Sequence, residues 1–481
     1  MLFNSFEYIL FLPAVFLLYW FVFKPLRWQN LLVVLASYLF YGWWDWRFLV
    51  LIAFTTLCSY ASGLAIEHYE GQRRVQRFIS AANIILNLGI LGVFKYYNFF
   101  VENLQAAFSL VGVQLDWPTL HVLLPVGISF YTFQALSYSI DVYRHKQQAT
   151  RDIIAFFAFI SFFPQLVAGP IERATNLLPQ FLKARQFDYG KAVDGCRQML
   201  WGFFKKIVIA DTCATYVDEI WSSYEAQNSF TLFIGVLMFS IQIYCDFSGY
   251  SDIAIGTARL FGINLMRNFN FPYLSRSIPE FWRRWHISLM TWFQDYIYFP
   301  LGGSRCSKAK RIRNTLIVFG VSGLWHGANW TFICWGLYHA LLFIPYVAFG
   351  INTKRDDTLP HKRTIGYTLK ALLQTGVTFL LAMGGWLIFR ADSMAQAVDY
   401  FSRICTWEFF NFKSGVKVTS LVIAFIMLII EYLQRDKQHG LEMNGQGIVR
   451  YAAVRYLIYV ILLILMVKFA TGAQQFIYFQ F

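Results

Sequence analysis

Residues 316–349 read LIVFGVSGLWHGANWTFICWGLYHALLFIPYVAF, and this stretch decides the fold class. It is longer than the roughly 20 apolar residues that a helix needs to cross a membrane. It is interrupted at Trp325-His326-Gly327, where Gly323 and Gly327 weaken helix continuity. We therefore expect two shorter helices that meet at His326. An ionisable side chain at membrane depth is costly to keep, which makes His326 a candidate functional residue.

The rest of the chain has the composition of a membrane protein. Of its 481 residues, 57% are hydrophobic and 14% are charged, whereas soluble domains carry about 25% charged residues. Apolar segments recur along the chain and predict about ten or eleven membrane spans, with a few shorter re-entrant pieces. We expect an all-α polytopic membrane protein that forms a single domain over residues 1–481. Its seven cysteines are scattered without a C-x-x-C pair, so no metal site is expected.

Positive charge is concentrated directly before residues 316–349. The chain has a formal charge of +14, and residues 267–315 hold nine Arg or Lys against two acidic residues. The simplest interpretation is a large cytoplasmic loop that obeys the positive-inside rule. The alternative is a surface for a phosphate-bearing cofactor, because Arg forms bidentate bonds with phosphate. The candidate cofactor-binding residues are Arg276, Arg283, Arg284 and Arg305.

A second histidine lies in Phe281-Trp-Arg-Arg-Trp-His-Ile-Ser-Leu. Residues 281–299 mix aromatic and charged side chains, which is typical of an amphipathic helix at the membrane interface. His286 would lie on that helix. A lone interfacial histidine usually has no special role, so spacing alone leaves the function of His286 open.

His326 has the stronger case for chemistry. It is flanked by Trp325, Asn329 and Trp330, with no carboxylate nearby in sequence. Burial should keep its imidazole neutral, and a neutral imidazole can take a proton from a hydroxyl group. The alternative is a packed histidine bonded to a backbone carbonyl. His339, thirteen residues on, should not share its helix face. The remaining histidines are expected to be solvated: His68, His121, His145, His361 and His439.

The segment Tyr244-Cys-Asp-Phe-Ser-Gly-Tyr-Ser-Asp is expected at the inner end of a span. It holds Asp246, Ser248, Ser251 and Asp252, and a catalytic triad of such residues with His326 is conceivable. Ser-Gly pairs also let helices approach closely, and we favour packing and hydrogen bonding for this segment. The chain contains no G-x-S-x-G elbow, no Walker loop and no dinucleotide-binding fingerprint.

Several motifs together resemble the membrane-bound O-acyltransferase family. The similarity is greatest to the bacterial branch that contains the alginate O-acetylation membrane protein and the D-alanyl-lipoteichoic acid transferase. It covers residues 1–395, and residues 396–481, expected to be C-terminal transmembrane helices, match least. The motifs are Pro125-Val-Gly-Ile-Ser-Phe-Tyr-Thr-Phe, Ala168-Gly-Pro-Ile-Glu-Arg, Asp246-Phe-Ser-Gly-Tyr-Ser-Asp, Asn268-Phe-Asn-Phe-Pro-Tyr, Glu280-Phe-Trp-Arg-Arg-Trp-His, Tyr298-Phe-Pro-Leu-Gly-Gly-Ser-Arg and Gly323-Leu-Trp-His-Gly-Ala-Asn-Trp.

This resemblance implies a ring of helices around a thin central region, with a funnel on one side and a tunnel on the other. It also implies that His326 is the active-site histidine and His286 the second histidine. Supporting roles would fall to Trp325, Asn329, Trp330, Asp246 and Ser248.

The implied activity is transfer of an acetyl group from cytoplasmic acetyl-CoA, with no permanently bound cofactor. The acceptor would be an exported or cell-envelope polysaccharide, and an alginate-like polymer is the favoured one. A periplasmic esterase-like partner protein would pass the acetyl group to it. The expected location is the bacterial inner membrane. Membrane lipids are expected partners, and nucleic acid is not. The competing hypotheses are a non-catalytic transporter or flippase, in which His326 relays protons, and a scaffold of an export complex.

Overall fold

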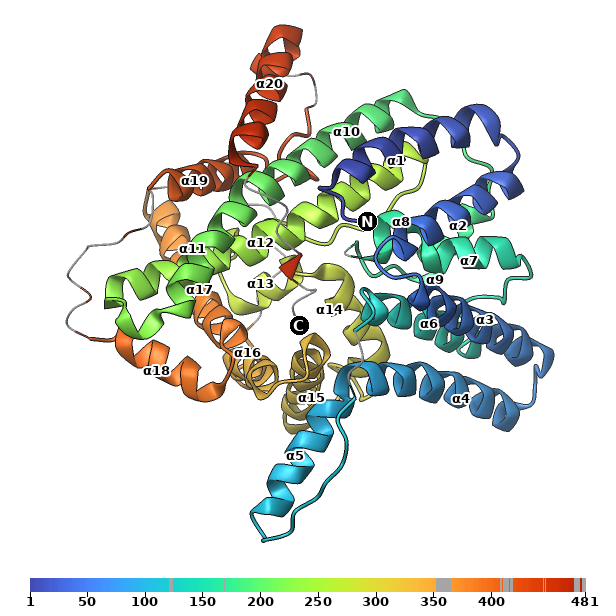
Figure 1. Ribbon diagram of the computed structural model, residues 1–481, viewed down its shortest axis with the longest axis horizontal. Coiled ribbons are helices and arrows are strands. Elements are labelled where there is room, and N and C mark those ends of the chain that lie inside the picture. The colour runs from blue at the N-terminus through green and yellow to red at the C-terminus, as the bar shows by residue number, and fades with distance from the viewer. Residues whose placement is uncertain are drawn as a thin grey trace. The chain divides into compact units, whose positions relative to one another are not determined.

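The computed structural model describes residues 1–120, 124–167, 169–351, 365–406, 409, 415, 418–443, 445, 447–470 and 476–477. Helices are the regular secondary structure of these residues, which include no strand (Figure 1). The chain divides into two compact units: unit 1 comprises residues 1–195 and 257–266, and unit 2 comprises residues 196–256 and 267–481. Helices α10 (Tyr189–Phe203) and α12 (Ser229–Leu260) contribute residues to both units.

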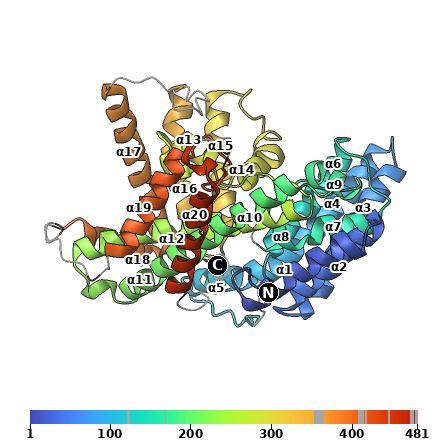
Figure 2. The same ribbon diagram turned by 90° about the horizontal axis from the view of Figure 1, so that it is seen from above.

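Unit 1 is built from the N-terminal helices. Within it, α3, α4 and α6 lie side by side, as the views in Figure 1 and Figure 2 both show. The helices of unit 1 are α1 (Phe6–Leu17), α2 (Leu26–Gly42), α3 (Arg47–His68), α4 (Arg73–Leu91), α5 (Tyr97–Ser109), α6 (Ile128–Tyr143), α7 (Ile153–Ser161), α8 (Phe163–Leu166) and α9 (Ala174–Phe181), with π-helical turns η1 (Leu18–Val22) and η2 (Gly92–Tyr96).

The interior of unit 1 is polar where α3, α4 and α6 meet. Ser59 Oγ donates to Asn83 Oδ1 at 3.3 Å, and the hydroxyl oxygens of Ser62 and Ser139 are 3.1 Å apart. On the outside, the side chain of Phe78 is 74% exposed and that of Ile85 is also largely exposed. Small and polar residues between helices, with large apolar residues outside, are typical of helices packed in lipid.

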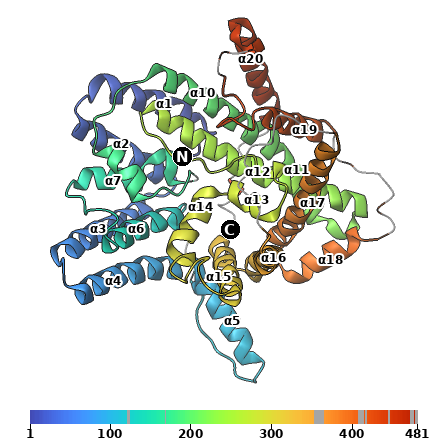
Figure 3. The ribbon, with the colours of Figure 1, turned by 180° about the vertical axis from the view of Figure 1, so that it is seen from behind.

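Unit 2 contains residues 229–256 of α12, the C-terminal part of α10 and the remaining helices. α15 and α16 pack against each other and α17 packs on α16, which Figure 3 shows from behind. The helices of unit 2 are α11 (Asp211–Ser222), α13 (Ile278–Arg284), α14 (Ile287–Phe293), α15 (Lys308–His326), α16 (Trp330–Ala348), α17 (Ile365–Arg390), α18 (Met394–Ile404), α19 (Val418–Leu433) and α20 (Ala452–Phe469), with π-helical segments η3 (Phe204–Ala210) and η6 (Gln294–Tyr298) and 3-10 turns η4 (Tyr224–Ala226), η5 (Pro272–Leu274) and η8 (Gly447–Arg450).

Several helices could cross a bilayer. In the described part of the chain, six helical segments are long and apolar enough: residues 47–68, 73–109, 229–260, 330–348, 369–390 and 452–469. Shorter apolar helices occupy residues 6–22, 153–166 and 419–433. The prediction of an all-α polytopic membrane protein is confirmed. The count of ten or eleven spans, the ring arrangement and the single domain over residues 1–481 stay predictions.

Two expected elements differ from the structure. α12 does not end near Tyr244 but continues to Leu260, so Asp246 and Ser248 lie within a helix rather than at its inner end. Residues 281–299 do not form one interfacial helix. They break at His286 into α13 and α14, and Trp282, Trp285 and Trp292 are buried. The aromatic residues that suggested an amphipathic surface instead form part of the interior of unit 2.

Candidate active site

Glycine residues determine the break between two helices at His326. α15 ends at His326, Gly327 has extended backbone, and α16 begins at Trp330. A Cβ at Gly323 would collide with the carbonyl oxygen of Phe332, and one at Gly327 would collide with the Phe332 ring. Both glycines therefore allow α16 to approach the end of α15 closely. The prediction that two helices meet at His326 is confirmed.

The imidazole of His326 is enclosed by aromatic rings. The residue is only 6% exposed, and its ring centroid lies 5.0 Å from that of Trp335 and 5.5 Å from that of Phe389, both in edge-on geometry. Trp335 comes from α16 and Phe389 from α17. Three helices of unit 2 thus hold this side chain in an apolar setting.

His286 lies at the joint between α13 and α14. Its backbone is in the left-handed region, at φ 45°, which is uncommon for a residue other than glycine and is often found at functional sites. Two backbone bonds hold the joint against the preceding segment: Ile287 N donates to Asn268 O, and Asn270 N donates to Arg284 O, each at 2.9 Å. The His286 side chain is 3% exposed, and its ring centroid lies 4.7 Å from that of Phe247.

The side chain of Asn268 determines which nitrogen of His286 carries the proton. Asn268 Nδ2 donates to Ser251 Oγ at 3.1 Å, while Oδ1 accepts from Ser288 Oγ at 2.9 Å. The same Oδ1 lies 3.1 Å from His286 Nδ1. An amide oxygen can only accept, so Nδ1 is the protonated nitrogen and the Nε2 lone pair is left for chemistry.

The two histidines influence each other electrostatically within unit 2. Burial lowers the pKa of His286 well below its ordinary value, and the charge that His326 would carry lowers this pKa further. Protonating both rings together is therefore unfavourable. Both residues that the sequence named as candidate catalytic groups thus lie in unit 2, and their role in catalysis stays a prediction.

His339 belongs to the same aromatic cluster. Its ring centroid lies 4.9 Å from that of Trp282 and 5.2 Å from that of Trp335, which also contacts His326. The prediction that His339 does not share a face with His326 assumed one continuous helix. Since the helix breaks at Gly327, the two side chains reach Trp335 from different helices. His439, predicted to be solvated, is 1% exposed, so that prediction is wrong.

Asp246 and Ser248 belong to a buried ionic network. Lys206 Nζ lies 2.9 Å from Asp246 and 2.7 Å from Asp211. Lys205 Nζ lies 2.6 Å from Asp252 and donates to Ser248 Oγ at 2.8 Å. These partners match the expectation of packing and hydrogen bonding rather than a triad with His326. Asp246 also accepts from Ile477 N at 2.8 Å, a contact with the C-terminal segment that sequence reasoning missed.

The four candidate arginines occupy different settings. Arg284 Nη2 lies 2.9 Å from Glu280, which also accepts from Arg276 Nε at 3.3 Å. Arg283 is partly buried, and Arg305 is exposed on the segment before α15. Arg276 and Arg284 therefore share one carboxylate, which stabilises the start of α13, and their role in binding phosphate stays a prediction.

The residues around the helix break have distinct roles. Asn329 Oδ1 accepts from Thr331 N at 3.0 Å and so caps α16, while Asn329 Nδ2 donates to Asp392 O at 3.0 Å. Trp325 is partly buried, whereas Trp330 is 55% exposed. Of these three, Asn329 has a clear structural function, because it fixes the start of the helix that carries Trp335.

Comparison with known proteins identifies the class. Residues 148–368 match the model of the membrane-bound O-acyltransferase family. Together with the similarity of full-length relatives, this shows that the chain belongs to that family and is an acyltransferase of the membrane.

Three similar proteins are named for acyl transfer to bacterial polymers. The chain is 40% identical to the probable alginate O-acetylase AlgI of Pseudomonas aeruginosa, over 87% of this chain and 79% of the relative. It is 31% identical to the peptidoglycan O-acetyltransferase of Helicobacter pylori, over 100% and 98% of the two chains. It is 29% identical to the teichoic acid D-alanyltransferase of Bacillus subtilis, over 55% of this chain and 68% of the relative.

Proposed function

We propose that this enzyme transfers an acetyl group from acetyl-CoA at the cytoplasmic face of a bacterial inner membrane to an exported or cell-envelope polysaccharide. Relatives over nearly the whole chain are named for O-acetylation of alginate and of peptidoglycan. Alginate-like polymers are the favoured acceptor, because the relatives with 37–40% identity carry the alginate name.

The observation that carries this proposal is the pair of buried imidazoles, His286 and His326. In the proposed reaction, His326 takes the proton of the acceptor hydroxyl as its oxygen attacks the thioester carbonyl carbon. The bond from that carbon to sulfur breaks, and the leaving CoA thiolate takes up the proton that His326 removed from the hydroxyl. Nε2 of His286, with Nδ1 held by Asn268, would orient the donor or pass on the proton.

The surrounding residues suit an acyl transfer that must exclude water. The rings of Trp335, Phe389 and Phe247 form apolar walls around the imidazoles. Low polarity strengthens the interactions of charges that develop during the reaction. The phosphates of acetyl-CoA would be held by Arg276, Arg283, Arg284 and Arg305. For Arg276 and Arg284, Glu280 would compete with the phosphates, because both arginines are bonded to its carboxylate.

A second protein completes the proposed pathway. A periplasmic esterase-like partner would receive the acyl group and esterify the sugar hydroxyl. The partner is inferred from the bacterial branch that the sequence resembles, and not from a contact in this chain.

The first prediction concerns cells that carry His326→Ala at wild-type protein levels. We expect the acetyl content of the exported polysaccharide to fall by about two orders of magnitude or more, because a general base contributes that much to the rate. The acetyl ester content of purified polymer is the measurement. The control is His68→Ala, which replaces an exposed histidine at the end of α3. Full acetylation in the His326→Ala strain would rule out the catalytic role.

A further inference from the structure

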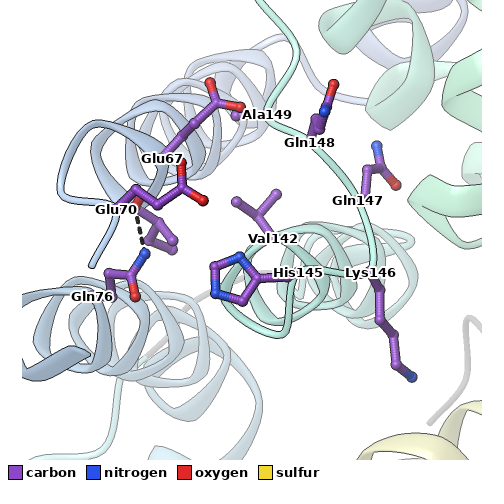
Figure 4. A pocket seen from close by; sticks show the side chains of 10 residues that line it. Glu67, Glu70, Gln76, Val142, His145, Lys146, Gln147, Gln148 and Ala149 are labelled. Atoms are coloured by element: carbon purple, nitrogen blue, oxygen red, sulfur yellow. Dashed lines mark hydrogen bonds between the residues drawn. The ribbon is translucent and has the colours of Figure 1, made fainter. Parts of the chain in front are cut away.

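Unit 1 contains a cavity that the proposed reaction does not use. It has a volume of about 300 Å³ and lies where the C-terminal ends of α3 and α6 meet the N-terminal end of α4. Figure 4 shows its lining, with side chains from all three helices and from the segment after α6. The lining residues are Ile66, Glu67, Glu70, Gln76, Val142, His145, Lys146, Gln147, Gln148 and Ala149.

One wall of this cavity presents hydrogen-bond acceptors. Gln76 is 1% exposed, and its Nε2 donates to Ile66 O at 2.9 Å, the bond dashed in Figure 4. The amide orientation is therefore fixed, and Oε1 has no hydrogen-bond partner among the described residues. A buried acceptor without a donor is unfavourable, so this oxygen points to a ligand that supplies an N–H or O–H group.

Two carboxylates line the same cavity as the buried amide oxygen. Figure 4 shows Glu67 and Glu70 on the same side of the cavity as Gln76, and neither forms a salt bridge within the described residues. His145 faces Gln76, while the ammonium of Lys146 points away from both carboxylates. Two carboxylates and one amide oxygen offer three acceptor groups, which is the number of N–H donors on a primary ammonium.

The position of the cavity suggests where such a group comes from. The apolar segments 47–68 and 73–109 are both long enough to cross a membrane, and the cavity lies where the first ends and the second begins. Arg73, Arg74 and Arg77 follow directly, which predicts the cytoplasmic face by the positive-inside rule. The Arg73 guanidinium lies over the Tyr143 ring at 5.6 Å, near the end of α6. The cavity is thus at headgroup level, with cationic side chains nearby for a phosphate.

We propose that this cavity binds a primary ammonium group through Glu67, Glu70 and Gln76. Two sources share that chemistry: an aminophospholipid headgroup, whose phosphate would meet the neighbouring arginines, and a free amine from the cytoplasm. The site lies in unit 1, whereas both candidate catalytic histidines lie in unit 2.

The test is lipid binding by the purified full-length protein, measured by native mass spectrometry. Wild-type protein is offered phosphatidylethanolamine or phosphatidylcholine, which differ in the N–H donors of the headgroup. We expect the ethanolamine lipid to bind more tightly by about tenfold, since the methylated headgroup has no N–H donor for the acceptors. This comparison needs no variant, so it does not depend on the folding of a mutant.

A variant pair adds a second measurement. Glu67→Gln combined with Glu70→Gln should remove the preference, whereas Glu102→Gln, an exposed carboxylate on α5, should keep it. Soluble glycerophosphoethanolamine separates the sources: competition at equal concentration supports a free amine, and failure to compete supports the intact lipid. Equal binding of the two lipids to wild-type protein would overturn the proposal, as would an unchanged preference in a folded double variant.

Discussion

At the scale of single residues, the site depends on how one amide orients one imidazole. Asn268 is held by Ser251 and Ser288 and in turn fixes the tautomer of His286. The sequence named both histidines, because each interrupts an aromatic or apolar run. It gave no role to Asn268, although this residue begins one of the family-like motifs. No local pattern shows that an asparagine eighteen residues before a histidine contacts its ring.

The tautomer assignment predicts a difference between two substitutions of Asn268. Asn268→Leu removes the acceptor, and we expect kcat to fall by about 10–100-fold with little change in KM for acetyl-CoA. Asn268→Asp keeps an acceptor and should restore much of the rate. Its negative charge should also raise the pKa of His286 and move the acidic limb of the rate profile to higher pH. If both variants are equally impaired with identical pH profiles, Asn268 only maintains the fold.

The lowered pKa of His286 predicts how stability depends on pH. The unfolded chain binds a proton at this residue near the ordinary value of 6.5, whereas the folded protein does not until the pH is much lower. Between these values the unfolded state binds more protons, so the free energy of unfolding falls as the pH falls, by about 1.4 kcal/mol per pH unit for one group.

This dependence can be measured with matched variants. Thermal unfolding of His286→Gln in detergent should lose less stability below pH 6.5 than the wild type. His68→Gln should follow the wild type, because His68 is exposed. Parallel curves for all three proteins would contradict the assigned burial of a neutral His286.

At the scale of helices, glycine sets the position of His326. Gly323 and Gly327 let α16 lie against α15, and Gly336 on α16 does the same where it meets Phe319. The sequence predicted the break, since glycines flank Trp325-His326. It could not predict the partner of each glycine, because which helix faces which is decided by tertiary packing. The same limit explains the error over residues 281–299, whose aromatic side chains face other helices.

Two glycines of α15 allow a controlled test. Gly323→Ala should destabilise the protein by about 1–3 kcal/mol, because the added methyl collides with the Phe332 backbone. Gly320→Ala on the same helix meets nothing within 4 Å and should be neutral or stabilise the protein by up to about 1 kcal/mol. Unfolding midpoints and acyl transfer rates of both variants are the measurements. Equal effects of the two substitutions would contradict the close packing of α15 on α16.

At the scale of the whole molecule, the composition was sufficient to predict the class of fold. The apolar segments and low charge predicted a polytopic helical membrane protein, and the joint presence of the motifs predicted the family. The buried ionic network was not foreseen. Lys205 and Lys206 lie buried beside Asp252 and Asp246. Charge in sequence predicts exposure on average, and only the fold shows which charges are paired.

The most direct test of the central claim is the release of CoA thiol from acetyl-CoA by purified protein in lipid vesicles, supplied with an acceptor. The proposed chemistry predicts release by the wild type and by His68→Ala, and a loss of about 100-fold or more for folded His326→Ala. Thiol release by His326→Ala at the wild-type rate would contradict the claim. So would the absence of any release by the wild type, which would favour a transporter.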